Sequence, residues 1–258
     1  AQGGSFAGFS ARPALPCRPR AVATRRPPVF ADSGAARRPR RHVHWMIRIQ
    51  SGAGSGRSSA SAKSAPAPAA SAATAMIVWD LDACCWDPEM YQLWGGGAPF
   101  KQESTRPNNR LTDCRGTTCR LLGDVAACWA ELHTRMQRGE PLLVGVASRS
   151  DEPDWARECL RKFVVKEGVS MMDVVSEARC EIYKGSKRSH FQALQRKTGI
   201  PFDRMCFFDD DMSNIRDVGG LGVHCVYTPQ GVTRDLFDRG FAAATKGLVL
   251  GAAEPGGE

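Results

Sequence analysis

An apolar run that ends in two acidic residues constrains the fold more than any other feature of the sequence. Residues 76–79 (Met-Ile-Val-Trp) are continuously apolar, which predicts a short buried strand. Asp80 and Asp82 follow, and both carboxylates would share a face if the strand continued. Ligands of open α/β sheets bind just outside the carboxyl ends of the strands. The pair therefore indicates either a site for a hard divalent metal or an acidic loop that caps a helix.

Charge is unevenly distributed along the chain. The formal net charge is +8, but residues 1–75 contain 12 basic residues and one acidic residue, Asp32, and account for +11. The remaining 183 residues contain 23 basic and 26 acidic residues, a net charge of −3. The basic character belongs to the N-terminal segment, so the global charge does not indicate a nucleic-acid-binding domain.

The N-terminal segment has a composition that does not build a core, because residues 51–75 are almost entirely Ser, Ala, Gly and Pro. We expect a disordered basic tail at 1–75, one folded domain at 76–248 and a disordered tail at 249–258. An Arg- and Ser-rich, acid-poor segment is typical of a transit peptide to a chloroplast or mitochondrion; otherwise we expect a cytoplasmic protein. Translated upstream sequence and an RNA-binding arm are the alternatives.

The distribution of apolar residues and cysteines argues against a membrane-spanning protein and against a zinc site. No apolar stretch reaches 18 residues, so we expect no membrane span. The ten cysteines are scattered without a CxxC pair, which gives a zinc site little support. Cys128, Cys206 and Cys225 fall in predicted helices or strands, where free cysteine packs as a small apolar residue. Cys114 and Cys119 could form a redox pair or be two free thiols.

A long irregular stretch is predicted between residues 82 and 123. It contains three glycines at 95–97 and several aromatic residues, among them Trp86, Tyr91 and Trp94. Loops of this length inside a compact domain are usually functional or disordered. Because the stretch directly follows the acidic pair, we expect a flap that covers the site and selects the substrate, with Trp86 packed onto the sheet.

Strands and helices alternate after residue 123. Apolar periodicity predicts helices over 124–139, 153–165, 187–199 and 233–245, with a shorter helix after 211. Strands are predicted over 141–147, within 173–182, and over 205–208 and 223–227, where we expect His224 to be a packed residue. This alternation predicts an α/β fold with a doubly wound parallel sheet.

Polar residues gather at the predicted carboxyl ends of these strands. Ser148 follows one strand, Asp209 and Asp210 follow another, and Asn214 lies about one helical turn further on. Lys187 falls in the first turn of a helix, where the macrodipole disfavours a cation unless it reaches an anion. All of these residues would then lie at one edge of the sheet, whereas chance would scatter them over both edges.

The order of these motifs resembles the haloacid dehalogenase superfamily of phosphatases. More narrowly, the chain looks like the eukaryotic magnesium-dependent phosphatase family, whose members act on phosphotyrosine and small sugar phosphates. The resemblance rests on residues 79–82 with Trp86, 147–150, 181–187, and 207–211 with Asn214, and it spans about residues 76–240. It implies a Rossmann-like fold with a flap loop and no large cap domain.

The resemblance implies roles in catalysis and substrate binding. Asp80 would be the nucleophile that forms an aspartyl phosphate, and Asp82 the general acid and base. Ser148 and Lys187 would act on the phosphoryl group, and Arg149 would help to bind the substrate. The implied protein is a monomer whose partner is a phosphorylated small molecule or a phosphotyrosine protein.

The resemblance also implies a magnesium site. An Asp80 oxygen, the backbone carbonyl of Asp82 and Asp210 would hold Mg²⁺, with Asp209 and Asn214 outside its coordination sphere.

Cys84 stands where the family's first motif usually has Thr, and Cys is a weaker hydrogen-bond donor. One alternative is a pseudoenzyme that binds phosphorylated ligands with little turnover. Another is a protein that associates with RNA through its N-terminal tail and carries an incidental phosphatase domain.

Overall fold

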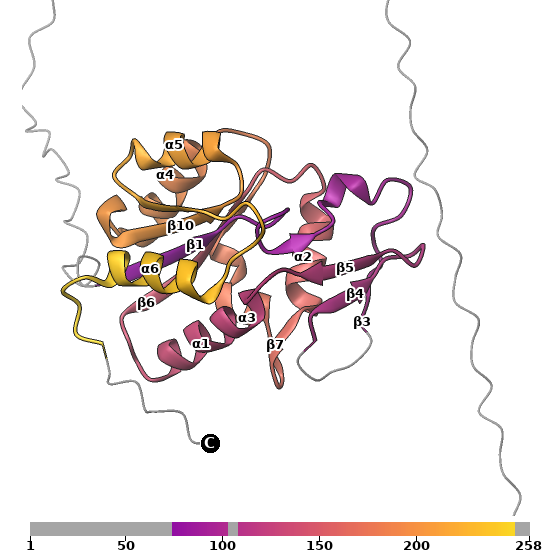
Figure 1. The fold of residues 1–258 in the computed structure, drawn as a ribbon, viewed down its shortest axis with the longest axis horizontal. Coiled ribbons are helices and arrows are strands. Elements are labelled where there is room, and N and C mark those ends of the chain that lie inside the picture. Colours follow the sequence, from indigo (N-terminus) through magenta and orange to yellow (C-terminus); the bar gives the residue numbers. More distant parts are fainter. Residues whose placement is uncertain (1–73, 103–107, 251–258) are drawn as a thin grey trace, which may run out of the picture. The chain divides into compact units, whose positions relative to one another are not determined.

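A five-stranded parallel sheet forms the centre of the described chain, which in this computed structural model comprises residues 74–102 and 108–250 (Figure 1). All four strand pairings are parallel. The order across the sheet is β11 (His224–Tyr227), β10 (Met205–Asp209), β1 (Ala75–Trp79), β6 (Leu142–Ser148) and β9 (Cys180–Ile182). The predicted α/β fold with a parallel sheet is confirmed.

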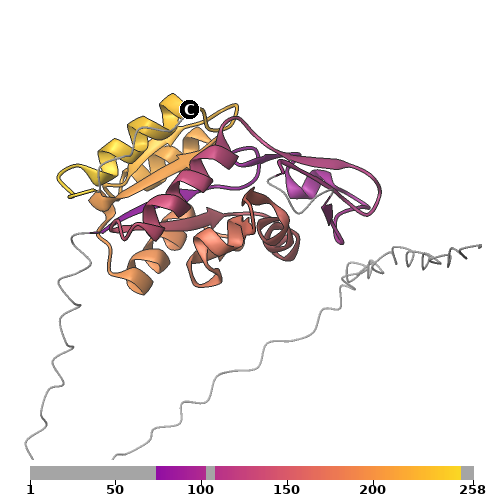
Figure 2. The ribbon, with the colours of Figure 1, turned by 90° about the horizontal axis from the view of Figure 1, so that it is seen from below.

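Strand β1 is buried on both faces because its side chains alternate between two hydrophobic clusters. Ile77 and Trp79 belong to one cluster, and Met76 and Val78 belong to the other. Helices cover both faces of the sheet (Figures 1 and 2). The first cluster includes α1 (Val125–Gln137), α2 (Pro153–Lys162), α3 (Met171–Val175) and α6 (Arg234–Thr245); the second includes α4 (Lys187–Thr198) and α5 (Met212–Gly219).

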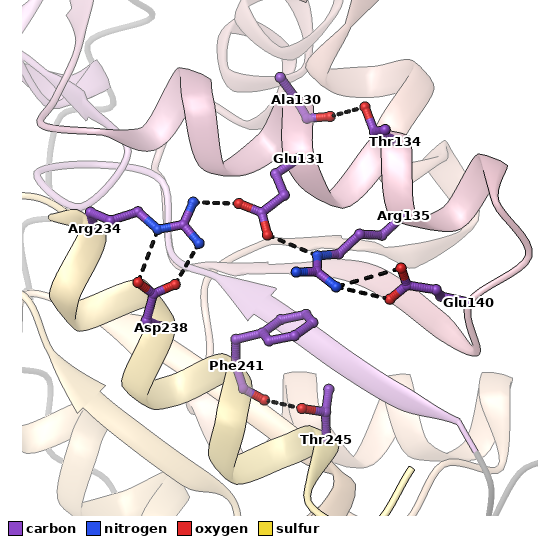
Figure 3. A network of polar contacts seen from close by, with 9 residues as sticks. All are labelled: Ala130, Glu131, Thr134, Arg135, Glu140, Arg234, Asp238, Phe241 and Thr245. Carbon is purple, nitrogen blue, oxygen red and sulfur yellow. Dashed lines mark hydrogen bonds and ion pairs between the residues drawn. The ribbon is translucent and has the colours of Figure 1, made fainter. Parts of the chain in front are cut away.

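Helices α1 and α6 are joined by an ion-pair network (Figure 3). Arg234 of α6 pairs with Glu131 of α1 and with Asp238 one turn further along its own helix. The Asp124 carboxylate accepts the Arg234 backbone N–H at 2.8 Å. Asp124 is the N-cap residue of α1, but its side chain makes no capping hydrogen bond there and binds the first turn of α6 instead.

The predicted irregular stretch after Asp82 also contains a small antiparallel sheet, which was not predicted. Its order is β2 (Trp86–Asp87), β5 (Thr118–Leu121), β4 (Arg110–Thr112) and β3 (Lys101–Gln102). Strands of two to four residues are too short to show a sequence period, which explains the error. We call residues 82–123 the flap. As expected, Trp86 is fully buried, and it stacks on Phe163 with ring centroids 5.9 Å apart.

Three further boundaries differ from the predictions. Helix α2 ends at Lys162, and the β-branched residues that follow form β7 (Val164–Lys166), which pairs with β8 (Val169–Ser170). The strand within 173–182 is confined to β9, and α3 precedes it. His224 is the first residue of β11 and only half-buried, with a ring nitrogen 3.0 Å from the Asp203 carbonyl oxygen.

The predicted tails lie almost entirely outside the residues that the structure describes. Ala75 is buried in β1, so the fold begins before the expected residue 76. Residues 1–73 and 251–258 lie outside the described residues, as does Cys17. No disulfide joins the cysteines of the described ranges. None of the helices within 74–102 and 108–250 is long and apolar enough to cross a bilayer.

Candidate active site

The carboxyl ends of β1 and β10 bring three carboxylates together. The two strands are neighbours, and the Asp80 N–H donates to the Phe208 carbonyl at 2.9 Å. One carboxylate oxygen from each of Asp80, Asp209 and Asp210 lies within 4.8 Å of the others. The parallel register places these acids side by side, since both strands end at the same edge.

Lys187 pairs with two of these carboxylates, those of Asp80 and Asp209. It opens α4, where Ser186 caps the helix by accepting the Arg188 N–H. Its Nζ lies 2.7 Å from Asp80 Oδ1 and 3.0 Å from Asp209 Oδ2, and its side chain is only 1% exposed. Burial alone would lower the pKa of Lys187, but the two carboxylates outweigh it and raise the pKa.

One ammonium group does not neutralise three carboxylates. Burial, followed by the repulsion from neighbouring acids, raises the pKa of Asp210 to about 7 and that of Asp209 to about 6. The pKa of Asp80 is also raised, by burial first, despite the contact with Lys187. A hard divalent cation would relieve this repulsion, and clustered carboxylate oxygens are the donors that Mg²⁺ prefers. The donor set therefore fits Mg²⁺.

Asp209 differs from the other two acids in its protein partners. Both of its oxygens accept from Asn214 Nδ2 at 3.1 Å, and Oδ1 also accepts the Asp211 N–H at 2.7 Å. Asp209 is fully buried. Asp80 and Asp210, by contrast, line an open cavity of about 280 Å³. Asp209 is therefore tied to the protein, while the other two face the space where a ligand would bind.

The flap, rather than Lys187, provides two hydrogen-bond donors to the Asp82 side chain. Ala83 has a left-handed φ of 59°, and the turn that follows brings Trp86 back against Asp82. Asp82 Oδ1 accepts the Trp86 indole N–H at 2.9 Å and the Met90 backbone N–H at 3.2 Å. Burial raises the pKa of Asp82, and hydrogen bonds from Trp86, Ser150 and Met90 oppose the rise.

The end of β6 supplies the opposite wall of the cavity. Ser148 is the last residue of the strand and is buried, and its Oγ accepts the Ser150 N–H at 3.2 Å. Arg149 is exposed at the cavity, and its Nη1 donates to Asn214 Oδ1 at 3.4 Å. All the site residues predicted from the sequence except Asp209 line this cavity.

Five lining residues were not predicted from the sequence. They are Glu89, Tyr91, Ser150, Asp151 and Asp211. Ser150, Asp151 and Asp211 lie within two residues of predicted site residues, so proximity to a strand end could have signalled them. Glu89 and Tyr91 come from the flap, and only their position after the acidic pair pointed to the site.

Cys84, which stands where the resemblance led us to expect Thr, has a hydroxyl neighbour. Its Sγ is buried and lies 3.4 Å from Thr228 Oγ1. The Thr228 N–H in turn donates to the Asp209 carbonyl at 2.9 Å. The loop after β1 is therefore linked to the segment after β11 at this position.

Comparisons with known proteins give a consistent set of relatives. Residues 72–246 match the family model described as acid phosphatase. Human magnesium-dependent phosphatase 1 is 32% identical over 185 residues, which are 69% of this chain and 93% of that protein. An HAD-like hydrolase superfamily protein of Schizosaccharomyces pombe is 31% identical over 151 residues, 57% of this chain and 81% of that protein.

A solved structure of lower similarity is the N-terminal part of a Bacteroides fragilis protein, which contains a phosphatase domain and is complexed with Mg. It is 17% identical, with a TM-score of 0.43, and the match covers 69% of this chain and 41% of that one.

Proposed function

Because the chain belongs to the acid phosphatase family of HAD-like hydrolases, we propose that it is a magnesium-dependent phosphomonoesterase that works through a phosphorylated aspartate. The observation that carries this proposal is the meeting of Asp80, Asp210 and Lys187 at the carboxyl edge of one sheet, beside an open cavity. Phosphoryl transfer depends on in-line positioning and charge neutralisation, which such a cluster provides.

Two acids divide the chemistry between them. The Asp80 carboxylate attacks phosphorus, and the bond between phosphorus and the leaving-group oxygen breaks as Asp82 gives that oxygen a proton. Asp82 then takes a proton from a water molecule that attacks the aspartyl phosphate, which releases inorganic phosphate and restores Asp80. The raised pKa of Asp82 supports its role as an acid near neutral pH.

Three cationic or polar groups bind the phosphoryl oxygens. Lys187 already contacts Asp80 and offsets the charge that gathers there. Ser148 donates its hydroxyl to one phosphoryl oxygen, and Arg149, exposed at the cavity, binds the substrate near its mouth. Because Arg149 also contacts Asn214, its guanidinium is directed toward the site rather than into solvent.

The same cluster would hold the metal. Asp80 and Asp210 would bind Mg²⁺ with the Asp82 backbone carbonyl, while Asp209 keeps Lys187 and Asn214 in place. When bound, the ion neutralises charge on the phosphoryl oxygens.

The substrates that we propose are phosphotyrosine or small sugar phosphates. The cavity is open, which suits a phosphate carried on a protein, and Tyr91 at its rim is 57% exposed and available to an aromatic ring. A phosphate-binding pseudoenzyme is the alternative. The presence of Asp80, Asp82, Lys187 and Asp210 in one site favours turnover.

Hydrolysis of p-nitrophenyl phosphate by the full chain tests the proposal. We expect turnover with Mg²⁺, none with EDTA, and a loss of at least about 10³-fold in Asp80→Asn. Asp203→Asn, an exposed acid outside the cavity, serves as the matched control and should retain activity. A folded, Mg²⁺-loaded protein that hydrolyses neither this ester, nor phosphotyrosine peptides, nor sugar phosphates would overturn the proposal.

A further inference from the structure

Two hydrogen-bond donors from the flap meet on one oxygen of Asp82. The Trp86 indole N–H and the Met90 backbone N–H both donate to Oδ1, at 2.9 Å and 3.2 Å. Both groups are donors only, so together they favour an Oδ1 that carries no proton. Oδ2 is the oxygen that these two flap donors leave free to carry the transferable proton.

The packing around Trp86 fixes the indole in this orientation. Its side chain is fully buried and stacks on Phe163 at an interplanar angle of 25°. Its backbone pairs with Leu121 in the flap sheet. A ring held on its face and at its backbone cannot turn its N–H away without disturbing the flap core. Met90 is also buried, at the start of the one-turn 3-10 helix Met90–Gln92.

We propose that Trp86 is a positioning residue for the general acid: its indole N–H, together with the Met90 amide, holds Asp82 with Oδ2 as the proton-bearing oxygen. The inference rests on the proposed phosphatase function. In the first half-reaction the proton on Oδ2 passes to the leaving-group oxygen as its bond to phosphorus breaks. Asp82 is left as a carboxylate, and its Oδ1 keeps both flap donors.

The structure also provides a matched control for the loss of an indole. Trp129 is another fully buried tryptophan, and it packs against Trp79 with ring centroids 5.5 Å apart. Its indole nitrogen has no hydrogen-bond partner among the described residues. Trp129→Phe therefore removes the same atoms from the core as Trp86→Phe without affecting Asp82.

The test compares substrates that differ in their need for a general acid. An alkyl phosphate has a poor leaving group that must be protonated, whereas 2,4-dinitrophenyl phosphate releases a stable phenolate without help. For Trp86→Phe in the full chain, we expect kcat/KM to fall about 10- to 100-fold for the alkyl ester and less than about 3-fold for the dinitrophenyl ester. Trp129→Phe should change both by the same small factor.

Asp82→Asn provides the reference for this pattern. It should show the same dependence on the leaving group, and adding Trp86→Phe to it should cause no further leaving-group-dependent loss. Equal losses of kcat/KM on both esters in Trp86→Phe, or no loss on either, would overturn the positioning role. If the wild-type protein hydrolyses no phosphomonoester, the proposed function fails and the positioning role fails with it.

A second measurement does not depend on activity. In the ¹H–¹⁵N spectrum of the metal-free full chain, the Trp86 indole resonance is identified by its loss in Trp86→Phe. We expect it to move in Asp82→Asn while the Trp129 indole resonance stays in place. An unchanged Trp86 resonance would show that the indole does not bind this carboxylate, and would overturn the proposal even if the protein is an active phosphatase.

Discussion

The carboxyl edge of the parallel sheet and the flap line the same cavity, but different interactions hold them in place. At the edge, all five residues of β1 and of β10 are buried, and ion pairs within the protein fix Asp80 and Lys187. The flap has strands of two to four residues and carries Tyr91 and Trp94, which are 57% and 92% exposed. The edge therefore holds its charged residues in a buried environment, which phosphoryl transfer needs. The flap presents exposed aromatic side chains, which can contact a substrate.

A single side chain organises much of the flap. The buried Asp113 carboxylate accepts the backbone N–H groups of Gly97, Arg115 and Thr117 at 2.7 to 3.0 Å. Changes at the edge should therefore affect stability and the chemical step. Apart from Asp82 and its hydrogen-bond partners Trp86 and Met90, changes in the flap should affect substrate binding.

The largest effect is expected for Lys187→Met. This change leaves Asp80 and Asp209 without their cation, and breaking a buried pair costs about 3–5 kcal/mol of unfolding free energy. Urea denaturation at pH 7 without Mg²⁺ measures it. Lys184→Met is the matched control, because its exposed pair with Asp151 should cost less than about 1 kcal/mol. Equal losses in the two variants would contradict the claim that buried ion pairs hold the edge in place.

Asp210→Asn tests the electrostatics of the edge through pH. The pKa of Asp210 is about 7 in the folded protein against an ordinary 3.8, so the folded state binds this proton more tightly than the unfolded state does. Without metal, the stability that Asp210 contributes should fall as pH rises from about 4 to 7 and then level off. Relative to Asp210→Asn, the wild type should lose on the order of 2 kcal/mol of unfolding free energy across this range. The loss is smaller than the full pKa shift implies, because solvent in the open cavity screens the Asp210 charge.

Thermal or urea unfolding of both proteins in EDTA measures this difference. Added Mg²⁺ should restore wild-type stability at pH 8 but not that of Asp210→Asn. Parallel stability curves for the two proteins between pH 4 and 8 would show that Asp210 does not feel the other carboxylates.

Asp113→Ala should loosen the flap and leave the edge intact. Three amides lose a charged acceptor, so we expect faster hydrogen exchange at residues 95–97 and 115–117. KM for a phosphotyrosine peptide should rise about 5- to 10-fold while kcat changes by less than about 2-fold. A collapse of kcat with KM unchanged would mean that the part of the flap held by Asp113 acts on the chemical step.

The smallest effect is expected for Tyr91→Ala. Tyr91 lines the cavity, so its loss should raise KM for aryl phosphates about 2- to 5-fold and leave kcat unchanged. Trp94→Ala is the control, because Trp94 does not line the cavity and should have no effect. If Trp94→Ala changed KM more than Tyr91→Ala did, the substrate would bind to another part of the flap than the one proposed.

The same contrast explains what the sequence could predict. Apolar runs that end in acids identify β1 and β10, and parallel strands bring their ends together, so Asp80, Asp209 and Asp210 could be placed from the sequence. Lys187 could be placed as well, because a cation in the first turn of a helix needs an anion nearby.

The flap could not be predicted in the same way. Its strands are too short for a hydrophobic period, and its turns depend on the Asp113 side chain rather than on a local motif. Glu89 and Tyr91 line the cavity from the flap, and no strand end in the sequence indicated them. The end of α2 was also misplaced, because Val164 continues the helical apolar pattern but pairs in β7.

In the proposed mechanism Asp80 carries the phosphoryl group, and chemical trapping tests this most directly. The full chain is mixed with substrate and Mg²⁺, quenched in acid and reduced with borohydride, which converts an aspartyl phosphate to homoserine, and the modified residue is found by peptide mass spectrometry. We predict homoserine at position 80 only when both substrate and Mg²⁺ are present. Turnover without homoserine, or homoserine at Asp82, Asp209 or Asp210 instead, would contradict the account.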